Sequence, residues 1–227
     1  MKRLSDFAAR IKQQEAEHAR RMETDPAYRA EVEAREAERA ARHAGYEVLR
    51  REEEFRVLGL PDRLAALLAV PEQLAPTAGV QAVERWLGDD LPFLVLGGNV
   101  GTGKTVAAAY AVSKRGGLFR KASQITRMSQ YDAEAWDRLY RAGLLVIDDL
   151  GTEPLDQGGW GMSALLDLFD RRYDDRARTV ITTNLTADAL KARYSSDGGR
   201  FADRLRETAR WINFAGPSLR TRPPEAA

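Results

Sequence analysis

The feature that most constrains this chain is the octapeptide at residues 98–105, which fits the pattern G-x-x-x-x-G-K-[ST]. An apolar run at 93–96 precedes it, and an alanine-rich run at 106–112 follows it. In a strand–loop–helix arrangement, glycines let backbone N–H groups turn inward around a phosphate, and the helix start adds partial positive charge. The sequence therefore predicts a phosphate-binding loop made of Gly98, Asn99, Val100, Gly101, Thr102, Gly103, Lys104 and Thr105.

Two residues of this loop carry the predicted chemistry. We expect Lys104 to reach the β- and γ-phosphates of ATP and the hydroxyl of Thr105 to ligate Mg²⁺. A glycine-rich turn with a surface lysine is the simpler alternative, and the flanking strand and helix patterns argue against it.

A second apolar run, at 143–149, ends in two adjacent carboxylates. In a parallel sheet these lie at the carboxyl end of the strand, beside the phosphate loop. We expect Asp148 to hold the metal ion and Asp149 to orient the attacking water. A turn or a helix cap is the alternative for an Asp-Asp pair, and the four preceding aliphatic residues make it less favoured.

Two weaker signals follow along the chain. A third apolar strand at 179–183 leads into Asn184, which could hydrogen-bond a γ-phosphate or form a turn. Arginine recurs at 199–206, and its planar fork suits a phosphate. The alternative for this run is a solvated helix face with Asp203 and Glu207 as partners.

In this order, the motifs resemble those of AAA+ ATPases of the DnaC/DnaI helicase-loader group, and they are similar to transposition ATPases of the IstB type. The resemblance spans roughly residues 56 to 216. It rests on the phosphate loop, Leu-Leu-Val-Ile-Asp-Asp-Leu-Gly-Thr-Glu at 144–153, Thr-Thr-Asn-Leu at 182–185, Gly-Arg-Phe-Ala-Asp-Arg-Leu at 199–205 and Gly-Leu-Pro-Asp-Arg at 59–63.

The resemblance implies roles for further residues. Asn184 would sense the γ-phosphate, and Arg204, with Arg200 as second candidate, would act on the nucleotide of a neighbouring subunit. The group more usually carries Asp-Glu where this chain has Asp-Asp, so Glu153 is an alternative to Asp149 as the base.

Strand and helix patterns alternate, which predicts an α/β fold with a parallel sheet flanked by helices on both faces. The resemblance makes this a P-loop AAA+ fold, and we expect no separate lid domain because the chain ends soon after the last strand. The expected ATPase domain covers 58–217, followed by a flexible tail at 218–227. Strands are expected at 93–97, 117–121, 144–149, 178–184 and 210–214, and helices at 105–114, 132–141, 161–174, 187–194 and 199–208.

Residues 1–57 differ in kind, with many alanines and balanced basic and acidic side chains. This composition predicts one helix from about 5 to 23 and a longer one from 26 to about 56. Asp25 would cap the second helix, with Pro26 in its first turn. The thin apolar stripe leaves two interpretations open: a solvated spacer, or a helix that docks on a partner. In the helicase-loader group this region grips a hexameric replicative helicase, so the resemblance implies that partner.

Composition excludes several other functions. Without cysteine the chain has no disulfide and no thiolate zinc site, and both histidines, His18 and His43, precede the ATPase region. This excludes serine–histidine catalysis in the core. No apolar run approaches the roughly 18 residues of a membrane span, so we expect a cytoplasmic protein with no membrane partner.

The net charge is +1, from 35 basic and 34 acidic side chains, so any binding of nucleic acid must be local. Candidates are Arg120, Lys121, Arg127 and the arginines at 200–210, with Tyr131 and Phe119 as weaker candidates for base stacking. Binding of single-stranded DNA is implied mainly by the resemblance.

The sequence thus favours a bacterial or phage helicase loader that assembles into a homo-oligomer on ATP or DNA and hydrolyses ATP at subunit interfaces. The alternative is an IstB-type ATPase that binds duplex DNA and recruits a transposase. A nucleotide-binding interaction protein with negligible turnover is the third possibility.

Overall fold

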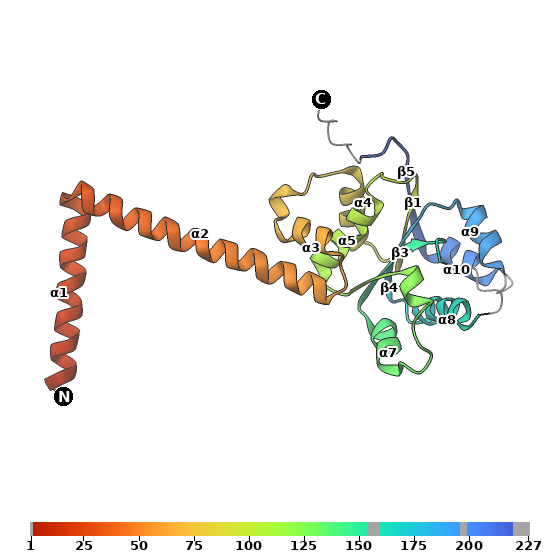
Figure 1. The fold of residues 1–227 in the computed structure, drawn as a ribbon, viewed down its shortest axis with the longest axis horizontal. Helices are drawn as coiled ribbons and strands as arrows, with labels where there is room; N and C mark the ends of the chain where they lie inside the picture. Colours follow the sequence, from red (N-terminus) through yellow and green to blue (C-terminus); the bar gives the residue numbers. More distant parts are fainter. Residues whose placement is uncertain (1, 154–158, 196–198, 220–227) are drawn as a thin grey trace, which may run out of the picture. The chain divides into compact units, whose positions relative to one another are not determined.

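The computed structural model describes residues 2–153, 159–195 and 199–219. The chain divides into two compact units, Met1–Arg50 and Arg51–Ala227. The first unit holds helix α1, Lys2–Thr24, and most of helix α2, Pro26–Val57 (Figure 1). Both helices expected from the composition are confirmed.

The corner between α1 and α2 is built by local contacts. The carboxylate of Asp25 accepts a hydrogen bond from the N–H of Tyr28 at 3.0 Å, as expected of a helix cap. The Tyr28 hydroxyl lies 2.9 Å from Nδ1 of His18, and the guanidinium of Arg21 lies over the Tyr28 ring at 3.8 Å. No residue described in α2 is buried, so this helix gains little from packing within its own chain.

The last turns of α2 belong to the second unit. Phe55 and Leu58 pack against the buried core of that unit. Leu58 also accepts a hydrogen bond through its carbonyl oxygen from the N–H of Phe119, at 2.9 Å. The chain beyond Arg50 is therefore part of the ATPase-domain packing.

A five-stranded sheet forms the centre of the second unit. Its strands are β1 (Phe93–Gly98), β2 (Leu118–Lys121), β3 (Leu144–Leu150), β4 (Arg178–Thr183) and β5 (Ala209–Phe214). They lie in the order β2-β3-β4-β1-β5, and every neighbouring pair is parallel. The carboxyl ends of β1, β3 and β4 therefore meet at one edge, which is where the predicted site residues follow each strand.

Helices cover both faces of the sheet, as expected (Figure 1). One face packs against α3 (Asp62–Ala69), α4 (Ala78–Leu87) and α5 (Lys104–Arg115), and the other against α6 (Ala122–Ile125), α7 (Ala133–Arg141), α8 (Trp160–Asp174), α9 (Ala187–Arg193) and α10 (Arg200–Thr208). Successive side chains of β1 point to opposite faces of the sheet. Leu94 and Leu96 pack with α3, α4 and α5, and Phe93 and Val95 pack with the helices on the other face. Helices α3 and α4 and the short 3₁₀ turn Pro71–Gln73 were not predicted from the sequence.

A buried arginine joins the second helical layer to the sheet. Arg172 of α8 is fully buried and donates to the carbonyl oxygens of Leu139, Tyr140 and Ala142 at the end of α7. It also donates to the carbonyl oxygen of Arg178 and the hydroxyl of Thr179. Burial lowers the pKa of Arg172 to about 10, so the side chain stays charged and these bonds offset its desolvation.

Within the described part of the chain, no helix has the length and apolar character needed to cross a bilayer.

Candidate nucleotide site

The phosphate loop follows β1 directly and ends where α5 begins. Gly98, Gly101 and Gly103 have φ angles of 126°, 83° and 92°, which side chains with a Cβ rarely adopt. The ammonium group of Lys104 lies 2.8 Å from the carbonyl oxygen of Gly98 and 2.6 Å from that of Asn99. The loop therefore folds around this lysine.

Lys104 is 6% exposed, and burial lowers its pKa. The carboxylates of Asp149 and Asp148 oppose that shift, so both lie near enough to act on its charge. The structure thus brings together the phosphate loop and the two carboxylates, as the strand order requires.

Asp148 lies at the end of β3 and is 1% exposed. Its carboxylate accepts a hydrogen bond from the Thr182 hydroxyl at 2.7 Å and has a side-chain hydrogen bond with Thr105. Burial raises the pKa of Asp148, and these two bonds and the positive charge of Lys121 oppose the rise. A buried carboxylate beside a threonine hydroxyl is a pair of hard oxygen donors, which Mg²⁺ prefers.

The donor set fits Mg²⁺ held together with a nucleotide rather than by protein alone. Among the described residues there is no group of three or more His, Cys, Asp or Glu side chains that could hold a metal ion. Mg²⁺ in phosphate-transfer sites takes only one or two protein ligands, and phosphate oxygens and water complete the shell. Thr105 and Asp148 would supply those protein ligands.

The backbone at Asp149 is strained. Its φ is 57°, a left-handed conformation that costs a non-glycine residue about 1 kcal/mol or more. The β3–β4 register is also irregular between Ile147 and Leu150. The two carboxylate residues also differ in exposure, because Asp148 is buried and Asp149 is partly exposed.

A threonine holds the two carboxylate residues in place. The hydroxyl of Thr182 in β4 accepts a hydrogen bond from the N–H of Asp149 at 2.9 Å while it donates to Asp148. The next hydroxyl, of Thr183, donates to the carbonyl oxygen of Leu150 at 2.7 Å. Sequence reasoning missed both roles. The two adjacent hydroxyls at the buried carboxyl end of β4 were the available signal, since buried hydroxyls need partners.

Asn184 is exposed and follows the last residue of β4. Since β4 lies between β1 and β3, Asn184 lies at the edge of the sheet between the phosphate loop after β1 and the end of β3, which carries Asp148. This is the place expected for a group that contacts the γ-phosphate.

Glu153, the alternative base, is already occupied. Its side chain is buried, and its oxygens accept hydrogen bonds from the N–H of Gly151 at 2.8 Å, from Arg193 at 3.1 Å and from the hydroxyl of Tyr194. The carboxylate raises the pKa of Tyr194 in addition to burial, the larger cause. Glu153 therefore holds the chain after β3 against α9, and its oxygens are not available to activate a water.

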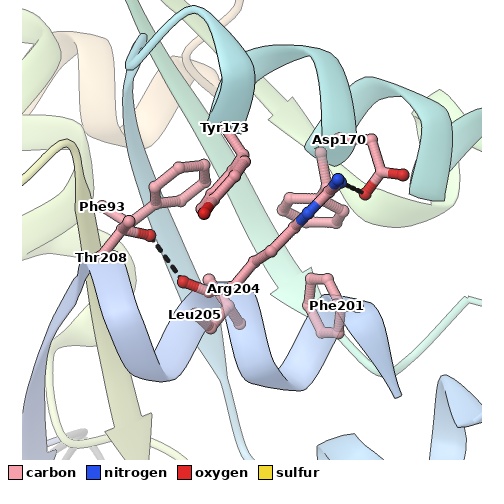
Figure 2. Close-up of a pocket in the computed structure, with 8 residues that line it drawn as sticks. Phe93, Asp170, Tyr173, Phe201, Arg204, Leu205 and Thr208 are labelled. Carbon is pink, nitrogen blue, oxygen red and sulfur yellow. Dashed lines mark hydrogen bonds and ion pairs between the residues drawn. The ribbon is translucent and has the colours of Figure 1, made fainter. Parts of the chain in front are cut away.

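Arg204 is also occupied within its own chain. Figure 2 shows it extending from α10 to form an ion pair with Asp170 of α8. Its guanidinium lies 4.7 Å from the centre of the Tyr173 ring. The pocket there includes Phe93, the first residue of β1, so Arg204 lies at the amino end of the strand whose carboxyl end carries the phosphate loop. Arg200 is exposed in the first turn of α10.

The residues proposed to contact DNA divide into buried and exposed ones. Arg120 is half-buried and donates to the carbonyl oxygens of Leu58 and Phe119, so it stabilises the fold and is a poor candidate for DNA contact. Phe119 is a core residue. Lys121, Arg127 and Tyr131 are exposed.

The parallel sheet in the order β2-β3-β4-β1-β5, with helices on both faces and the phosphate loop after β1, defines a P-loop fold of the AAA+ type. Residues 85–227 match the family described as IstB-like ATP binding protein. The chain belongs to that family.

Solved structures share this fold. The DnaC helicase loader is 19% identical with a TM-score of 0.51, and the match covers 63% of this chain and 94% of that one. DnaI is 22% identical with a TM-score of 0.53, covering 71% and 95%. DnaA from Aquifex aeolicus, bound to AMPPCP, is 18% identical with a TM-score of 0.50, covering 63% and 49%. No curated protein sequence matches the chain.

Proposed function

We propose that this protein binds ATP with Mg²⁺ at residues 98–105 and hydrolyses it. The observation that carries the proposal is the convergence of Lys104, Asp148 and Asp149 at one edge of the sheet. Lys104 would meet the β- and γ-phosphates, Thr105 and Asp148 would hold the metal ion, and Asp149 would orient water. Bound Mg²⁺ would neutralise charge on the phosphates.

Two variants test this assignment. Lys104→Ala is expected to lose ATP binding with the fold intact, and Asp149→Asn to keep ATP bound while turnover stops. Lys114→Ala is the matched control, because Lys114 is an exposed lysine on the same helix. Equal binding of labelled ATP by the parent and Lys104→Ala proteins would refute the site.

We further propose that the protein assembles into a homo-oligomer in which an arginine of α10 acts on the ATP of the next subunit, with Arg204 as first candidate and Arg200 as second. In the single chain Arg204 is held in an ion pair with Asp170, so both residues are tested. An arginine supplied across an interface is worth about a thousandfold or more in turnover. Arg204→Ala should remove the rise in turnover with protein concentration and retain ATP binding. If only Arg200→Ala did this, the assignment would move to Arg200.

For the cellular role, we propose an ATP-dependent loader that places a replicative helicase on single-stranded DNA. The fold shared with the DnaC helicase loader and the exposed apolar side chains of the amino-terminal arm support this role. Phe7 and Ile11 lie one turn apart on the same face of α1 and are 63% and 39% exposed. A helix that docks in a groove presents anchors at this spacing.

The arm test uses opposite faces of α1. Phe7→Asp with Ile11→Asp should abolish capture of the hexameric helicase, while nucleotide binding is retained. Ala9→Asp with Gln13→Asp is the matched control, with the same spacing and charge on the opposite face. Equal capture by both double variants would contradict docking through this stripe. The arm should be removed at residue 50, because Phe55 packs with the ATPase unit.

The second candidate is a transposition ATPase that binds duplex DNA and recruits a transposase. Membership of the IstB-like family favours it. A loader should capture a helicase and prefer single-stranded DNA, whereas a transposition ATPase should prefer duplex DNA and capture no helicase. A competition assay with both DNA forms, together with helicase capture, separates the two roles.

A further inference from the structure

The glycines of the phosphate loop have close neighbours from the end of the described chain. A Cβ atom at Gly98 would lie 2.4 Å from the carbonyl oxygen of Phe214, and one at Gly101 would lie 2.1 Å from the hydroxyl oxygen of Ser218. One at Gly103 would lie 3.5 Å from a methyl carbon of Leu219. The segment 214–219, which we call the C-terminal strap, therefore follows the phosphate loop along its length.

A turn after β5 directs the strap. Gly216 has a φ of 143°, which other residues rarely adopt, and Pro217 fixes the backbone that follows it. The chain thus leaves the sheet beside β1, its neighbour, and reaches the loop that follows β1 (Figure 1).

A backbone hydrogen bond joins the strap to the loop. The N–H of Leu219 donates to the carbonyl oxygen of Gly101 at 2.8 Å. In a trans peptide the carbonyl of one residue and the N–H of the next point in opposite directions. Because the Gly101 oxygen points to the Leu219 N–H, the N–H of Thr102 points away from the strap, and N–H groups of such loops bind phosphate oxygens.

The peptide between Gly101 and Thr102 benefits from such a restraint. Glycine allows several backbone orientations, so Gly101 by itself does not fix the direction of the Thr102 N–H. Apolar burial contributes little to the contact, because Leu219 and Val100 are each 61% exposed. The strap is thus better suited to orienting one peptide than to stabilising the fold.

We propose that the C-terminal strap is a positioning element of the nucleotide site, and that the Leu219 N–H orients the Thr102 N–H toward the bound phosphate. This inference rests on the proposed binding of ATP at the loop. Because binding linkage is reciprocal, ATP should also stabilise the strap, and the Leu219 N–H should exchange more slowly when ATP is bound.

Two truncations test the proposal. A chain ending at Gly216 lacks the strap contact, and a chain ending at Leu219 keeps it and serves as the matched control. The dissociation constant of a fluorescent ATP analogue with Mg²⁺ should rise roughly three- to tenfold in the first protein, the value of one hydrogen bond. It should stay within about twofold of the parent in the second.

A second pair isolates the hydrogen bond. Leu219→Pro removes the N–H and should weaken binding as the longer truncation does, whereas the conservative variant Leu219→Ala keeps the N–H and should restore affinity. Melting temperatures without nucleotide should agree within about 2 °C, and only the ATP-induced rise should shrink in the variants that lack the bond.

Parent-like affinity in the chain ending at Gly216 would overturn the proposal, and so would an equal loss in the chain ending at Leu219. Failure of the parent itself to bind ATP, or equal binding by Lys104→Ala, would instead refute the proposed function. The two failures are therefore distinguishable.

Discussion

Replacing Thr182 by valine should show how much the end of β3 depends on one hydroxyl. Valine has nearly the shape of threonine, so the change removes the hydroxyl and leaves the packing almost intact. The N–H of Asp149 would lose its acceptor, and the carboxylate of Asp148 would lose a donor. The neutral bond is worth about 1 kcal/mol and the bond to the charged carboxylate about 1.5–3 kcal/mol.

The expected loss is therefore about 2.5–4 kcal/mol in the free energy of unfolding, or roughly 5–15 °C in melting temperature for a domain of this size. Denaturant unfolding of the parent and the variant at one fixed pH measures it. Thr182→Ser is the matched control, because serine keeps the hydroxyl, and it should recover most of the loss. A Thr182→Val protein within about 0.5 kcal/mol of the parent would refute the bridging role.

Three further predictions concern residues around the site and the fold. Arg172→Met should destabilise the protein by about 3–5 kcal/mol in denaturant unfolding, because several buried carbonyl oxygens lose their donor. Asp149→Gly should relieve the left-handed strain and raise stability by about 1 kcal/mol, while ATP turnover is lost. Burial raises the folded-state pKa of Asp148, so the folded protein binds this proton more tightly than the unfolded chain does. The resulting stabilisation is fully present below the ordinary pKa of aspartate and is lost as the pH rises through the raised pKa. Asp148→Asn should remove that decline, as unfolding measured across this pH range would show; an undiminished decline would contradict the assignment.

The sequence was sufficient to predict that the phosphate loop and the two carboxylates lie together, because each of these motifs follows the end of a strand. A phosphate loop after one apolar run and two carboxylates after another can meet only if their strands are parallel and close together. The observed order, with β4 between β3 and β1, meets that requirement. The alternation of strands and helices was confirmed for the same reason, since apolar periodicity survives in a single sequence.

The details that depend on distant partners could not be predicted. Arginine is a common phosphate ligand, so the sequence favoured that role for Arg204. Its ion pair with Asp170 depends on the packing of α8 against α10, which the sequence does not show. Glu153 is similar, because Arg193 and Tyr194 reach its carboxylate from α9. The contact between Leu219 and Gly101 also joins segments far apart in sequence.

The affinity for ATP with and without Mg²⁺, compared between the parent and Asp148→Asn proteins, tests the central claim most directly. If Thr105 and Asp148 hold a metal ion that binds together with the nucleotide, Mg²⁺ should tighten ATP binding by the parent and have much less effect on Asp148→Asn. Lys104→Ala should bind ATP weakly under both conditions. An equal effect of Mg²⁺ on the parent and Asp148→Asn proteins would contradict the account.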